Sequence, residues 1–129
     1  MLFRSEITTV SATAATGTIN FDALTQGVLI YTTNASGNWT LNVRGDGSTS
    51  LNTVMATGET QSIVFIATQG STAYYPTSFT IDGSAVTPKW QGGTAPAAGN
   101  ASSDDAYTYA ITKTGSATFR VYASQTKFA

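Results

Sequence analysis

Apolar and polar residues alternate at every second position along much of this chain, and this periodicity limits what the chain can fold into. In "WTLNVRG", Trp39, Leu41 and Val43 alternate with polar residues, as in a strand that buries one face. No segment shows a convincing 3.6-residue pattern. The sequence therefore predicts an all-β domain, with Trp39 in its core.

Three segments depart from simple alternation. "GVLIYTT" (27–33) and "SIVFIAT" (62–68) are more continuously apolar, which is typical of strands buried on both faces, and the second is expected at the centre of the fold. "TSLNTVMATGET" (49–60) is ambiguous, because Leu51, Val54 and Met55 would share a helical face. We expect a strand or an irregular crossover there.

Turn signals recur about every ten residues, which favours a sandwich or barrel of short strands. Asp82-Gly83 predicts a two-residue hairpin, and a second hairpin is expected to turn near residues 114–116. Its inward side chains would be Tyr107, Tyr109 and Ile111 facing Phe119 and Val121. The predicted fold is a single domain over residues 1–129, a jelly-roll-like β-sandwich of eight or nine short antiparallel strands. Residues 1–15 are considered as an N-terminal arm.

Composition narrows the function classes. The chain has no cysteine, no histidine and a formal net charge of −1, so we expect no cofactor, no metal site and no nucleic-acid partner. No apolar run approaches the ~20 residues of a membrane helix, and no Sec-type signal is visible after Met1, which is expected to be the natural start. A soluble protein without a membrane partner is predicted.

Nothing in the sequence favours an enzyme. A Ser/His/Asp set is impossible without histidine. Asp104 and Asp105 are adjacent, so on a strand they would point to opposite faces and are expected to be a solubilising pair rather than a glycosidase's two acids. "RGDGS" (44–48) is expected to be an ordinary turn rather than an adhesion ligand.

The segment "VTPKWQGGTAPAAGNASS" (86–103) is rich in small residues and carries one tryptophan. With "NWTLNVRGDGSTSLN" (38–52) and the terminal "YTYAITKTGSATFRVYASQTKFA" (107–129), it resembles a β-rich structural module of the virions of cyanophages and related marine phages. The resemblance runs from roughly Asn20 to Ala129.

The resemblance implies a non-enzymatic structural protein on the surface of a virus particle, either a capsid decoration or a part of the tail or fibre. Its expected partners are copies of itself, in a trimer, and other virion proteins. The alternative function is a tail-fibre module that binds a host surface glycan.

The candidate interface residues are Lys89, Trp90, Gln91, Tyr74 and Tyr75. A loop of small residues can lie flat on a neighbouring subunit, with Trp90 as the buried anchor. Two roles remain open for Trp90, because it could instead cap the core of its own domain beneath a surface loop. The aromatic residues could also stack on sugar rings.

Overall fold

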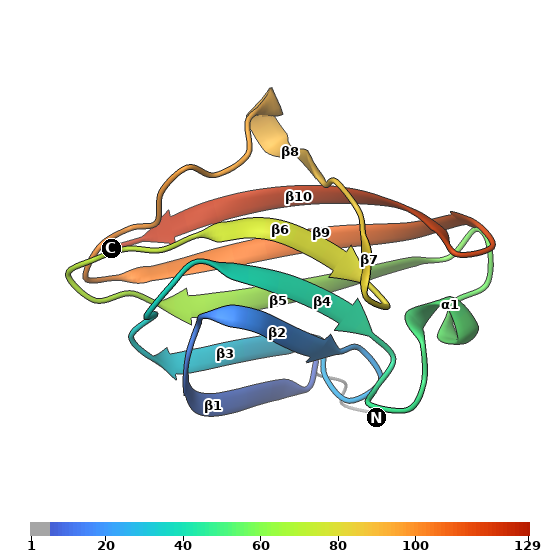
Figure 1. Ribbon diagram of the computed structural model, residues 1–129, viewed down its shortest axis with the longest axis horizontal. Helices are drawn as coiled ribbons and strands as arrows, with labels where there is room; N and C mark the ends of the chain where they lie inside the picture. Colours follow the sequence, from blue (N-terminus) through green and yellow to red (C-terminus); the bar gives the residue numbers. More distant parts are fainter. Residues whose placement is uncertain (1–5) are drawn as a thin grey trace, which may run out of the picture.

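Two β-sheets make up most of the molecule (Figure 1), and the computed structural model describes residues 6–129. The six-stranded sheet has the order β1 (Thr8–Ala14), β3 (Val28–Thr33), β5 (Thr60–Thr68), β9 (Asp104–Gly115), β10 (Thr118–Phe128) and β8 (Lys89–Trp90). The four-stranded sheet has the order β2 (Gly17–Asp22), β4 (Trp39–Arg44), β6 (Pro76–Ile81) and β7 (Ser84–Ala85). The all-β prediction is confirmed.

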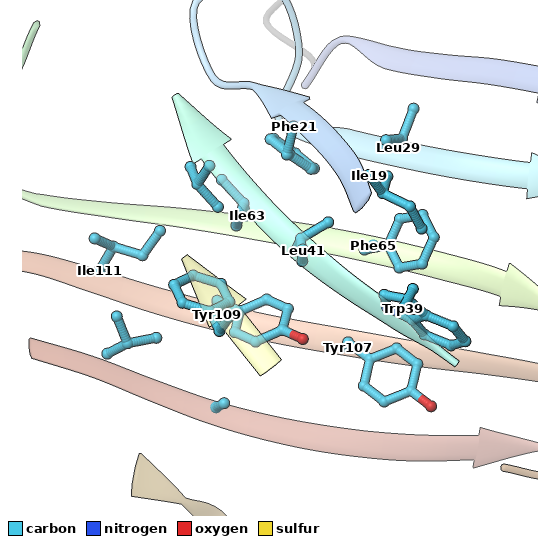
Figure 2. Packing of buried hydrophobic residues seen from close by; sticks show 14 of the residues in the cluster. Ile19, Phe21, Leu29, Trp39, Leu41, Ile63, Phe65, Tyr107, Tyr109 and Ile111 are labelled. Atoms are coloured by element: carbon cyan, nitrogen blue, oxygen red, sulfur yellow. The ribbon is translucent and has the colours of Figure 1, made fainter. Parts of the chain in front are cut away.

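Buried aromatic side chains from both sheets meet in one core (Figure 2). Trp39 of β4 is buried, as predicted, and its ring lies edge-on to Phe65 and Tyr107 at centroid distances of 5.6 and 5.5 Å. Phe79 of β6 stacks on Tyr109 of β9 at 4.8 Å. These pairs connect the sheets, because each joins a residue of the four-stranded sheet to one of the six-stranded sheet.

Strand direction differs from the prediction. The pairs β1–β3, β3–β5, β2–β4, β4–β6 and β8–β10 are parallel, whereas β5–β9, β9–β10 and β6–β7 are antiparallel. The expected arrangement of antiparallel strands is therefore wrong for half of the molecule, and the strands number ten among the described residues. The reason is that β1 to β6 alternate between the two sheets, so that each strand pairs with the next but one along the chain.

Both predicted hairpins are confirmed. Asp82 and Gly83 have φ values of 51° and 81°, the positive angles that a type I′ turn needs at both central positions. The longer hairpin joins β9 to β10 through Ser116 and Ala117. Its inward residues are Tyr107, Tyr109, Ile111 and Val121, which are buried, and Phe119, which packs against the core.

The ambiguous segment contains a short helix, α1 (Leu51–Val54), so the expectation of a strand or irregular crossover is wrong there. The carboxylate of Asp82 accepts hydrogen bonds from the backbone nitrogens of Leu51 (2.7 Å) and Asn52 (3.0 Å). At the other end, the ammonium of Lys113 donates to the carbonyls of Asn52 (2.7 Å) and Met55 (2.8 Å). Opposite charges at the two ends stabilise a helix, and both come from distant parts of the chain.

Part of the predicted N-terminal arm belongs to a sheet. Thr8–Ala14 forms β1, which pairs with β3, while residues 1–5 lie outside the described residues. No helix within residues 6–129 is long and apolar enough to cross a membrane.

Candidate functional site

The 86–103 segment crosses from the four-stranded sheet to the far edge of the six-stranded sheet, where β8 lies above β10 in Figure 1. The backbone nitrogen of Val86 donates to the carbonyl of Phe79 at 3.0 Å, and Lys89 and Trp90 pair with Tyr122 and Ala123 of β10. The segment therefore shields part of an edge strand that would otherwise be open to pairing.

A buried polar cluster holds the end of this segment. The carboxylate of Asp105 accepts hydrogen bonds from the side-chain nitrogen of Gln69 (3.0 Å) and the backbone nitrogen of Asn100 (2.9 Å). Gln69 also donates to the carbonyl of Tyr74 at 2.6 Å. Gly99 lies against all three groups, since a Cβ there would come within 2.5 Å of the Tyr74 carbonyl oxygen.

This cluster corrects one sequence prediction. Asp104 and Asp105 do point to opposite faces, but only Asp104 is exposed, and Asp105 is fully buried. The two acids are therefore not a solubilising pair. Asp105 is buried because donors from two loops satisfy one of its oxygens, and sequence spacing gave no sign of that convergence.

Trp90 packs on the core of its own subunit. Its ring is half-buried and lies edge-on to Tyr109, with the centroids 5.9 Å apart. Of the two roles left open for this residue, the structure shows the capping of its own core. Part of the ring remains exposed and lines three surface hollows.

We expect Trp90→Ala to lower the free energy of unfolding by about 2 kcal/mol, less than the roughly 3–5 kcal/mol typical of a fully buried tryptophan. Urea melts at a concentration where the protein is monomeric would measure the loss. A variant that kept its full urea resistance but no longer associated would show that Trp90 acts mainly as an anchor on another subunit.

The largest hollow lies between β6 and the 86–103 segment. This groove, called the Trp90 groove below, has a volume of about 540 Å³ and is lined in part by Pro76, Phe79, Pro88, Lys89, Trp90 and Tyr109. Small-molecule sites usually occupy about 300–1,000 Å³. The groove is thus large enough for a ligand of several rings or a few peptide residues.

The other sequence candidates fall into two places. Lys89 and Gln91 are exposed and line a second hollow together with Tyr122 on the other side of β8. Tyr74 and Tyr75 are half-buried just before β6 and line none of the three hollows around Trp90. The five candidates therefore do not form one patch.

Sequence reasoning missed the most apolar surface, the outer face of the six-stranded sheet. Two adjacent rows of outward residues cross this sheet without a charged side chain, and we call them the outer face. They are Thr8, Val28, Val64, Thr108 and Ser124 in one row, and Val10, Ile30, Ile66, Ala106 and Thr126 in the other. Val10 is 67% exposed, and Val28, Ile30, Val64 and Ile66 are half-buried.

The four-stranded sheet has a different outer surface. There Asn42 donates to Asn20 at 3.0 Å and accepts from Thr80 at 2.7 Å, while Thr40 and Ser78 share a hydrogen bond. Cross-strand polar pairs of this kind suit a surface in contact with water. The contrast shows that the apolar character of the outer face is particular to one sheet.

The remaining motifs form ordinary structure. In the "RGDGS" turn, the backbone nitrogen of Ser48 donates to the carboxylate of Asp46 at 2.8 Å and lowers the pKa of that group. Gly45 is buried in this turn, so the turn prediction is confirmed. Burial raises the pKa of Tyr107 and of Tyr109. Within residues 6–129 no three acidic side chains gather as a metal site would require.

Comparisons of the chain with protein-family models, curated proteins and solved structures gave no match.

Proposed function

We propose that this protein is a non-enzymatic structural component of a virus particle, located at the particle surface in a capsid decoration or in the tail or fibre, and that it assembles with copies of itself. The resemblance of residues 20–129 to a virion module of cyanophages and related marine phages supports the viral part of the proposal. The outer face of the six-stranded sheet supports self-assembly.

The outer face carries the proposal because it leaves apolar strands half covered. β1, β3 and β5 are parallel neighbours, and parallel strands usually lie in sheets that are buried on both faces. Here Leu29 and Phe65 point into the core, but Ile30 and Ile66, which follow them, point outward. A second copy placed against this face would remove the Val and Ile side chains from water.

The border of the outer face fits a subunit interface as well. Exposed Lys89 and Gln91 lie beside Tyr122, which is 48% exposed. Apolar centres surrounded by polar and aromatic residues are typical of protein interfaces. The sequence candidates Lys89 and Gln91 would then lie at the rim of the contact. The expected assembly is a trimer that also contacts other virion proteins.

Two measurements test this proposal. Sedimentation of the purified protein is expected to show an oligomer at micromolar concentration, and mass spectrometry of purified particles from an infected host is expected to detect the chain in stoichiometric amounts. A protein that stayed monomeric at hundreds of micromolar would contradict self-assembly. Absence of the chain from intact particles would contradict the viral role.

The second candidate function is recognition of a host surface glycan. The Trp90 groove favours it, since aromatic side chains border a hollow of ligand size. Aromatic faces stack on the C–H faces of sugar rings.

A further inference from the structure

We infer that the Trp90 groove binds an acidic sugar, with a uronic acid ring lying against the aromatic wall and its carboxylate paired with Lys89. The inference goes beyond the structural role and does not depend on self-assembly. It gives the second candidate function a site and a ligand class.

The walls of the groove suit a ring with one apolar face. Phe79, Trp90 and Tyr109 belong to three different strands and line the same hollow, together with Pro76 and Pro88. Phe79 and Tyr109 are buried and Trp90 is half-buried, so their ring positions are fixed by packing before any ligand arrives. A preformed wall of this kind lowers the ordering cost of binding.

Hydroxyl groups around the groove suit a ligand that carries hydroxyls. Thr77 and Ser78 of β6 are exposed and line the groove on the side opposite the 86–103 segment. The pairing registers of β6 give Thr77 no partner on either neighbouring strand. Its backbone and side chain therefore remain available to a ligand at the rim.

A second observation comes from the side chain of Tyr109. This residue is fully buried, and its hydroxyl has no hydrogen-bond partner among the residues that the structure describes. Buried hydroxyls are normally hydrogen-bonded. Tyr109 lines the groove (it is labelled in Figure 2), and an oxygen of a bound sugar would supply the missing partner.

The charge around the groove selects an anion. Lys89 is the charged residue that lines it, no carboxylate does so, and Lys89 has no ion-pair partner within residues 6–129. A carboxylate paired with a lysine makes a charge-assisted hydrogen bond. A neutral sugar would leave this ammonium without a partner, and a cationic ligand would be repelled.

The test compares two probes that differ in charge alone. Calorimetric titration with trigalacturonic acid is expected to show saturable binding, and the methyl ester of the same trisaccharide is expected to bind at least about tenfold more weakly. Lys89→Gln should weaken binding of the acid by about tenfold. Lys127→Gln removes the same charge from an exposed site outside the groove, and should leave the affinity unchanged.

A second variant probes the floor of the groove. Tyr109→Phe removes a hydroxyl that has no protein partner, so the fold should keep its melting temperature while affinity for trigalacturonic acid falls several-fold. Equal losses in Lys89→Gln and Lys127→Gln would reveal a diffuse charge effect and overturn the inference. Failure of trigalacturonic acid to bind at millimolar concentration would overturn it, as would tighter binding of octanoate, an anion without a sugar ring. None of these outcomes bears on the sedimentation test of self-assembly.

Discussion

Ile66→Lys is expected to abolish most self-association while leaving the fold intact. Ile66 lies in the middle of the outer face, between Ile30 of β3 and Ala106 of β9. A lysine there would place an unpaired charge at the centre of an apolar contact. Disrupting a central interface residue costs at least about 2 kcal/mol, which corresponds to a roughly 30-fold rise in Kd. Sedimentation velocity over a range of concentrations would measure the change.

Thr18→Lys is the matched control for Ile66→Lys. Thr18 is an exposed residue of β2, on the four-stranded sheet, so the same charge is added to the other side of the molecule. We expect this variant to associate like the unaltered protein. If Ile66→Lys and Thr18→Lys both kept full association, the outer face would not be the interface. Far-ultraviolet circular dichroism would show whether each variant remains folded.

Gly99→Ala is expected to lower the free energy of unfolding by about 3 kcal/mol. Its new Cβ would lie 2.5 Å from the carbonyl oxygen of Tyr74, 2.6 Å from the side-chain nitrogen of Gln69 and 2.9 Å from a carboxylate oxygen of Asp105. Added atoms in a packed site cost about 1–3 kcal/mol, and weakening hydrogen bonds to a buried carboxylate adds about 1.5–3 kcal/mol. A loss of this size should lower Tm by on the order of 10 °C.

Gly115→Ala serves as the comparison for Gly99→Ala. At Gly115 the nearest atom to an added Cβ is in Thr118 at 3.8 Å, an ordinary contact. We expect its Tm to stay within a few degrees of that of the unaltered protein. If Gly99→Ala melted at the same temperature as Gly115→Ala, the end of the 86–103 segment would not depend on the buried cluster around Asp105.

Much of the fold could be predicted because it depends on local properties of the chain. Alternation in β4 identifies Trp39, Leu41 and Val43 as core residues, since side chains on a strand point to opposite faces in turn. Asp82-Gly83 forms the predicted hairpin because few other residue pairs tolerate positive φ at both positions. Both properties belong to residues that are neighbours in the sequence.

The candidate sites were predictable only in part. Trp90 is conspicuous in a segment of small residues, and the structure places it beside a groove. The outer face was missed because the apolar runs around Ile30 and Ile66 predict strands buried on both sides, and a sequence does not say which side its own chain leaves uncovered. Even so, those runs were the signal that a second covering surface is needed.

The sequence by itself determined that strands form, where the chain turns, and which side chains of each strand face the core, because these follow from local preferences and the two-residue period. Only the tertiary structure decided which strands pair and in which direction, since a strand pattern is the same for parallel and antiparallel neighbours. The same holds for Asp105, whose burial depends on Gln69, 36 residues away, and on Asn100. It also holds for α1, whose ends are capped by Asp82 and Lys113 from other parts of the chain. Such contacts form only when distant segments meet, so no local pattern encodes them.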